Sequence, residues 1–100
     1  MRTALPAVDV RINGVRRTAL VDSGCSQCVC EVSLCTQWRR WNVSLQAIDG
    51  QMMPCLGTGR VQLQVGGSEE ITVDVIVVDK SPLGYKFILG MNGIEALGGV

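Results

Sequence analysis

The chain contains no histidine, and this absence removes a large part of enzyme chemistry. It excludes the Ser–His–Asp triad, the Cys–His pair and every zinc site that uses imidazole. A net charge is missing too, because nine Lys and Arg residues balance nine Asp and Glu residues. This balance disfavours a protein that binds mainly nucleic acid phosphates or anionic lipid. Acid–base chemistry near neutral pH is therefore left to carboxylates, cysteine, lysine or tyrosine.

Long apolar runs are also absent from the sequence. The longest strongly apolar run covers residues 75–78, which suits a strand and is far short of the roughly 20 residues that span a bilayer. The first residues show no apolar stretch of the kind found in a secretory signal. We therefore expect an intracellular protein that is not secreted and has no membrane partner.

What the sequence does contain is alternation of apolar and polar residues, which is typical of strands. Residues 8–12 alternate up to an Asn-Gly turn, and residues 15–21 return as the second arm of a hairpin. The same pattern recurs, with glycine in the turns, at residues 43–47, 61–65 and 71–77. Several short strands at this spacing predict an all-β barrel or sandwich. No linker or change in composition divides the 100 residues, so we expect one domain, residues 1–100.

One short helix is expected near the C-terminus. Asn92 is a suitable N-cap for residues 93–97, and Gly98 and Gly99 would end the helix.

Five cysteines invite a metal or redox interpretation, and their positions are Cys25, Cys28, Cys30, Cys35 and Cys55. The first four lack the two separated C-x2-C pairs of a structural zinc site, and an odd number cannot pair completely in one chain. Cys28 and Cys30 would share one face of a strand. We expect reduced, partly buried side chains and no metal, with a cysteine-based metal or redox module as an alternative.

The most informative stretch is residues 19–24, in which three apolar residues precede Asp22, Ser23 and Gly24. This order places Asp22 at the end of a buried strand, where an unpaired carboxylate is costly. Ser23 adds a hydroxyl beside it, and Gly24 permits a tight turn. A carboxylate held in this way suits general acid–base catalysis. On the tripeptide alone, however, an ordinary turn after a strand is the favoured interpretation.

Three other segments admit more than one interpretation. Residues 38–41 (Trp-Arg-Arg-Trp) resemble segments that stack on nucleic acid bases. We expect instead a surface turn with its rings packed on the barrel, and no nucleic acid partner. Met52 and Met53 suit either substrate contact or core filling. Residues 57–60 lack the helix and lysine of a phosphate loop, so we expect a hairpin arm.

Three motifs in order make the chain resemble the retroviral-type aspartic proteases (retropepsins) of retroviruses and LTR retrotransposons. The first is residues 20–24 (Leu-Val-Asp-Ser-Gly) after a hairpin, and the last is residues 88–92 (Ile-Leu-Gly-Met-Asn) before a short helix. Between them, residues 47–58 resemble the glycine-containing flap. The resemblance covers residues 5–98. It implies a closed, all-β retropepsin-like (acid protease) barrel with one short C-terminal helix, in a homodimer.

The resemblance also implies an aspartic endopeptidase that needs no cofactor. Peptide hydrolysis of this kind uses two carboxylates that share one proton and activate a water. The chain supplies one such motif, so a second copy must supply the other aspartate at a two-fold axis. The implied substrate is a Gag-Pol-type polyprotein, cleaved inside the cell or in a virus-like particle.

Site residues follow from the same resemblance. Asp22 would be the catalytic aspartate, Ser23 would bind across the dimer axis, and Gly24 would hydrogen-bond the substrate backbone. The flap tip would consist of Asp49, Gly50 and Gln51. The side-chain pockets would be lined by Val29, Ser81, Pro82, Leu83 and Ile88. Residues 97–100 would form a strand that interleaves with the partner chain.

Two positions depart from the family pattern. Relatives often carry an acidic residue two places after the motif glycine and an arginine in the later motif, where this chain has Ser26 and Met91. Without this ion pair we expect a weaker dimer. A non-catalytic homodimerisation module with the same fold is the main alternative to the protease.

Overall fold

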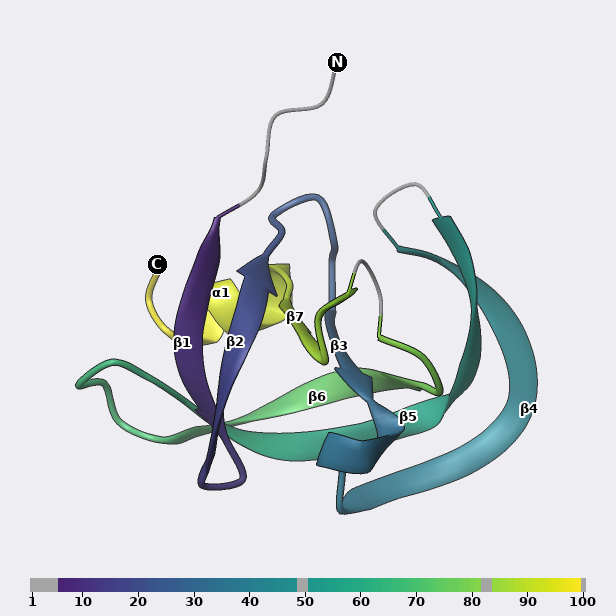
Figure 1. Cartoon of the computed structure of the whole chain (residues 1–100), viewed down its shortest axis with the longest axis horizontal. Coiled ribbons are helices and arrows are strands. Elements are labelled where there is room, and N and C mark those ends of the chain that lie inside the picture. Colours follow the sequence, from purple (N-terminus) through teal and green to yellow (C-terminus); the bar gives the residue numbers. More distant parts are fainter. Residues whose placement is uncertain (1–5, 49–50, 82–83, 100) are drawn as a thin grey trace.

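Strands make up most of the computed structural model, which describes residues 6–48, 51–81 and 84–99 (Figure 1). The strands are β1 (Ala7–Ile12), β2 (Val15–Val21), β3 (Cys28–Glu31), β4 (Gln37–Ile48), β5 (Gln51–Val65), β6 (Ile71–Val78) and β7 (Phe87–Leu89). A 3-10 helix, η1 (Val32–Leu34), follows β3, and the α-helix α1 (Met91–Ala96) follows β7. The prediction of a mainly β fold with one short C-terminal helix is confirmed.

The seven strands form one sheet in the order β1-β2-β7-β3-β6-β5-β4. An additional pairing of β1 with β5 closes the sheet into a barrel, and β4 pairs with the outer part of β5. Most pairs are antiparallel, whereas β2 pairs with β7 and β3 with β6 in parallel. Figure 1 shows the long β4 and β5 bending away from the rest of the sheet as one hairpin. The predicted closed barrel is confirmed by this topology.

The first hairpin forms where the Asn-Gly turn predicts it. Asn13 and Gly14 have φ values of 51° and 82°, the left-handed conformations that a two-residue hairpin turn requires. The Asn13 side chain also donates to the carbonyl of Leu34 (3.1 Å) and accepts from the amide of Gln62 (3.0 Å). The turn is thereby attached to η1 and to β5.

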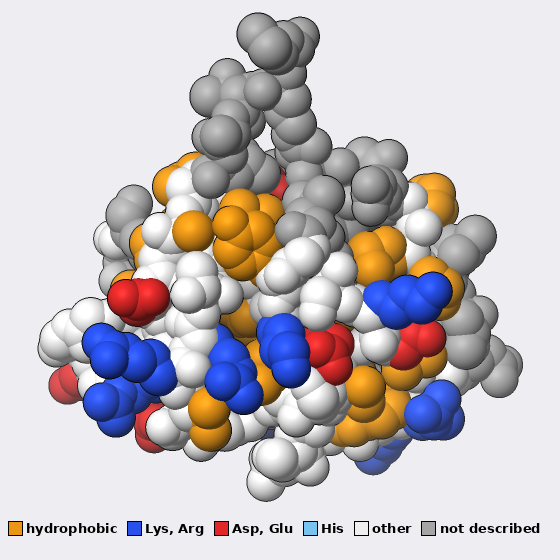
Figure 2. Space-filling model, viewed as in Figure 1, with side chains coloured by type: hydrophobic (Ala, Val, Ile, Leu, Met, Phe, Trp, Pro, Cys, Tyr) orange, Lys and Arg blue, Asp and Glu red, His pale blue; other side chains and the backbone are white. Residues whose placement is uncertain are grey.

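Two apolar clusters use alternate residues of the same strands. The larger one, the barrel core, includes Val10, Ile12, Cys28, Cys30, Val61, Leu63, Val73, Val75, Val77, Phe87 and Leu89. The smaller one, which we call the upper cluster, consists of Leu20, Cys25, Val29, Val78 and Ile88. On the surface, Figure 2 shows basic and acidic side chains interspersed with hydrophobic ones, in keeping with the zero net charge.

The helix differs from its prediction at its start. Gly90 is the N-cap, and Asn92 lies inside the first turn because its side chain bonds to β3 and β6 instead. Gly98 and Gly99, with φ values of 81° and 92°, follow the helix end as predicted. In the single chain, residues 97–99 form this helix end and turn, without strand structure. No helix in the described part of the chain is long and apolar enough to cross a membrane.

Residues 38–41 lie within β4, so the predicted surface turn is wrong. Pairing with β5 holds them extended: Trp38 packs against the barrel core, and the Arg40 guanidinium lies 5.1 Å from the centroid of its ring. Trp41 is 38% exposed and donates through its indole N–H to the Thr58 hydroxyl (3.2 Å). The predicted hairpin arm at residues 57–60 is part of β5.

All five cysteines are free and buried, as small apolar side chains would be. Burial raises the pKa of every thiol, that of Cys28 to about 11. Thiols with raised pKa values are poor nucleophiles at neutral pH. Among the described residues, no three Cys, Asp or Glu side chains are arranged to hold a metal ion.

Candidate active site

The two outer sequence motifs lie side by side in the sheet. Leu20 and Val21, at the end of β2, pair in parallel with Ile88 and Leu89 of β7. The backbone N–H of Asp22 then donates to the carbonyl of Leu89 (3.0 Å). A segment far away in sequence therefore fixes the position of Asp22.

The Asp22 carboxylate is buried, with 4% of the residue exposed. Its Oδ1 accepts from the backbone N–H of Gly24 (3.0 Å). Its Oδ2 is also buried and has no hydrogen-bond partner in the described part of this chain. Because nearly all buried polar atoms are bonded, an oxygen left in this state makes Asp22 a candidate functional group.

A tight turn presents the two residues after Asp22 to solvent. The backbone N–H of Cys25 donates to the carbonyl of Asp22 (3.1 Å), which closes the turn. Ser23 and Gly24 are exposed at its tip. They are therefore accessible to a partner chain or a substrate, as their expected roles require.

The second motif supports this turn from behind through its backbone. The N–H groups of Met91 and Asn92 donate to the carbonyls of Cys25 (2.8 Å) and Ser26 (3.1 Å). Gly90 packs so closely that an added Cβ would collide with the carbonyl groups of residues 25 and 27. A side chain at position 90 would push the turn after Asp22 out of place.

Asn92 provides further support that the sequence prediction missed. Its Oδ1 accepts from the backbone N–H of Cys28 (2.8 Å), and its Nδ2 donates to the carbonyl of Asp74 (2.9 Å). The side chain therefore joins α1 to the first residue of β3 and to β6. Its place directly after the Gly-Met pair of the second motif is the sequence signal for this role.

Cys25 is a second residue of this region that the sequence prediction missed. Its side chain belongs to the upper cluster and is 9% exposed. Burial raises the pKa of the Cys25 thiol, and the negative charge of the nearby Asp22 raises it further. The thiol is therefore neutral at neutral pH and does not add a second negative charge beside the carboxylate.

The expected pocket residues Val29 and Ile88 are fully buried in the upper cluster, with 0% exposure. Met53 and Tyr85 pack against this cluster. In the single chain, Val29 and Ile88 therefore have no exposed surface, and substrate contact would require these neighbours to move. Met52, in contrast, is 60% exposed. The two methionines therefore differ: Met53 packs against the upper cluster and Met52 faces solvent.

Ser81 lies on the Glu31 carboxylate. Its hydroxyl donates to Oε2 of Glu31 (3.3 Å), and the Lys86 ammonium lies 3.8 Å from the same oxygen. A hydrogen bond from Ser33, with help from Lys86 and Ser81, lowers the pKa of Glu31.

Of the expected flap residues, Gln51 is the first residue of β5. The other expected flap and pocket residues, Asp49, Gly50, Pro82 and Leu83, lie outside the described residues.

Comparisons with known proteins agree with this geometry. A family model described as aspartyl protease matches residues 8–92, a range that contains both motifs. No curated protein gives a match. Among solved structures, EIAV protease complexed with the inhibitor HBY-793 is similar in fold, with a TM-score of 0.71 and 22% sequence identity. The similarity covers 96% of this chain and 90% of that chain.

Proposed function

The chain belongs to the aspartyl protease family, and we propose that it is an aspartic endopeptidase that cleaves extended polypeptides. The observation that carries the proposal is the Asp22 carboxylate. It is buried at a strand end, bonded through one oxygen, and unpartnered at the other among the described residues. Such a group is suited to hold or accept a proton where water is largely excluded.

In the proposed mechanism, two Asp22 carboxylates share one proton across a two-fold axis, because like charges so close cannot both ionise. The ionised carboxylate takes a proton from a water that attacks the scissile carbonyl carbon. The protonated carboxylate gives its proton to the carbonyl oxygen. Collapse of the tetrahedral intermediate breaks the C–N bond, and the amine leaves with a proton from the dyad.

The second carboxylate comes from a second copy of the chain in this proposal. Asp22 is the one charged residue buried within the described part of the chain, so a single copy offers half of a dyad there. Ser23 and Gly24, exposed beside it, are available for contacts across the axis. Since Ser26 and Met91 cannot form an ion pair, we expect the dimer to be weak.

The substrate we propose is a Gag-Pol-type polyprotein, processed inside the cell or in a virus-like particle. Two observations support this choice. The fold is similar to that of a viral protease, and five free, buried thiols suit a reducing compartment.

Substitution of the carboxylate tests the activity. We expect Asp22→Asn to reduce cleavage of a peptide library at about pH 4 to 7 by at least 10²-fold, because acid–base catalysis is lost. The variant should stay folded, since the Asn oxygen can still accept from Gly24. Asp9→Asn, at an exposed position of β1, is the control and should retain activity. A transition-state analogue of aspartic proteases should block the wild type. If the folded wild type cleaves no peptide, the non-catalytic dimerisation module is the better interpretation.

A mixing experiment tests the shared site. Excess Asp22→Asn protein added to a fixed amount of wild type should suppress activity, because most wild-type chains then pair with an inactive partner. Activity that stays constant in the mixture would mean that one chain suffices.

A further inference from the structure

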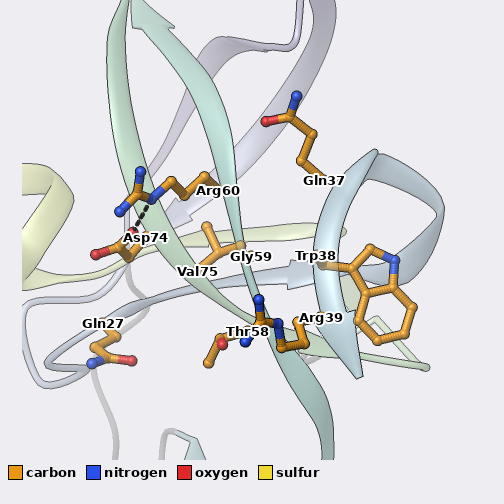
Figure 3. A pocket seen from close by; sticks show the side chains of 9 residues that line it. All are labelled: Gln27, Gln37, Trp38, Arg39, Thr58, Gly59, Arg60, Asp74 and Val75. Atoms are coloured by element: carbon orange, nitrogen blue, oxygen red, sulfur yellow. Dashed lines mark hydrogen bonds and ion pairs between the residues drawn. The ribbon is translucent and has the colours of Figure 1, made fainter. Parts of the chain in front are cut away.

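A groove of about 460 Å³ lies on the face of the sheet opposite the barrel core (Figure 3). It crosses β4, β5 and β6 and ends at the loop before β3. The polar residues that line it are Gln27, Gln37, Arg39, Thr58, Arg60 and Asp74. None of them takes part in the proposed catalytic chemistry.

Strand register explains how these side chains come together. Gln37 of β4 faces Arg60 of β5, which in turn faces Asp74 of β6. In the next outward-facing row, Arg39 lies opposite Thr58. Alternate residues of paired strands point to the same side, so the two rows form one polar surface.

The two arginines of the groove differ in their partners. Arg60 Nε lies 3.0 Å from Oδ1 of Asp74, and the dashed line in Figure 3 marks this pair. Arg39 has Thr58 opposite it, and no carboxylate of the described residues pairs with its guanidinium. Among the residues that the structure describes, the groove therefore retains one positive charge, on Arg39, that no carboxylate neutralises.

The remaining polar groups add hydrogen-bond donors around Arg39. The Thr58 oxygen already accepts from the Trp41 indole (3.2 Å), so its own proton is available to a ligand. The side-chain amides of Gln27 and Gln37 supply further N–H groups. A planar guanidinium in a groove lined by neutral donors suits a carboxylate, which it can bind through two parallel hydrogen bonds.

The groove is also attached to the back of the catalytic turn. Gln27 belongs to the loop that follows Asp22, and its backbone carbonyl lies directly against Gly90. Asp74, at the other edge, accepts through its carbonyl from the Asn92 side chain (2.9 Å). A ligand in the groove would therefore contact two residues that touch the second motif: Gln27, which packs against Gly90, and Asp74, which is hydrogen-bonded to Asn92.

We propose that this groove is a second substrate-binding site, which takes a Glu or Asp side chain of the polypeptide at a point outside the candidate active site. The proposal rests on the proposed protease function, since that function supplies a polypeptide long enough to reach the outer face. Exposed ion pairs are individually weak, so we expect the acidic side chain to improve binding by about five-fold.

Direct binding to the Asp22→Asn protein tests this site without depending on cleavage. The probes are an acetylated, amidated peptide with a central Glu-Glu pair and the same peptide with Gln-Gln. In a titration followed by amide NMR, the Glu peptide should bind about five-fold more tightly and shift the signals of Gln37 and Thr58. Arg39→Gln should remove this preference. Arg16→Gln, which changes an exposed arginine of β2 outside the groove, should preserve it.

Three results would overturn the assignment. One is equal binding of the Glu and Gln peptides by the Asp22→Asn protein. Another is that Arg39→Gln and Arg16→Gln reduce the preference for the Glu peptide equally. The third is binding of free glutarate or inorganic phosphate as tightly as the Glu peptide, which would indicate a site for small anions. Because no arm measures cleavage, a failure here is distinct from a failure of the protease proposal.

Discussion

At the scale of single residues, the site depends on positions where ordinary packing rules are broken. Asp22 is a buried carboxylate with one oxygen unpartnered in the described chain, and Gly90 leaves no room for a side chain. The sequence predicts Asp22 because three apolar residues precede it and Gly24 follows. It does not predict Cys25 beside the carboxylate, since that proximity depends on how the turn closes.

We expect Gly90→Ala to destabilise the fold by about 2 kcal/mol, because the new methyl group would displace backbone carbonyls in a tightly packed site. Activity should fall with it, since the same carbonyls position the Asp22 turn. Urea unfolding and peptide cleavage measure the two effects. Gly67→Ala is the matched control, because a Cβ there meets nothing within 4 Å. Equal stability of the two variants would contradict the close packing.

At the scale of elements, the sequence predicts structure well where neighbouring residues determine it. It predicts structure poorly where contacts with distant strands determine it. The predicted hairpin at Asn13 and Gly14 is confirmed, because the conformations of these two residues determine the turn. The helix start is wrong because Asn92 bonds to two distant strands and leaves capping to Gly90. The turn expected at residues 38–41 is wrong because pairing with β5, a distant segment, keeps them extended.

Asn92→Ala tests how strongly α1 is joined to the strands. The substitution leaves the N–H of Cys28 without its acceptor and the carbonyl of Asp74 without its donor, so we expect a loss of about 1–3 kcal/mol. Hydrogen exchange should become faster at Cys28 in particular. Glu95→Ala, on the exposed side of the same helix, should change stability little. A fold that tolerates both substitutions equally would show that the Asn92 bonds contribute little.

At the scale of the whole molecule, the buried thiols make stability depend on pH. Burial raises the pKa of all five above the ordinary value of 9.0. The folded protein therefore keeps protons that the unfolded chain releases in alkali. The stabilisation is complete below about pH 9 and is lost as the pH rises toward the folded pKa values.

We therefore expect the free energy of unfolding to fall between about pH 9 and 10, by up to about 1.4 kcal/mol per pH unit for each thiol. Urea unfolding with a reductant present measures this slope. Cys28→Ala should show a shallower slope than the wild type, because one titrating group is gone. A stability that stays constant from about pH 7 to 10 would mean that the thiols do not contribute.

The parallel pairing of β2 with β7 has a consequence for how the protein is made. The turn at Asp22 takes its backbone partners from Leu89, Met91 and Asn92, near the end of the described chain. While the ribosome is still synthesising the segment before these residues, the turn has only its own local hydrogen bonds, and contacts between such distant segments form slowly. In the proposed protease, the nascent chain would therefore gain a complete site only after residues 89–92 have emerged, which would delay cleavage of any neighbouring polypeptide.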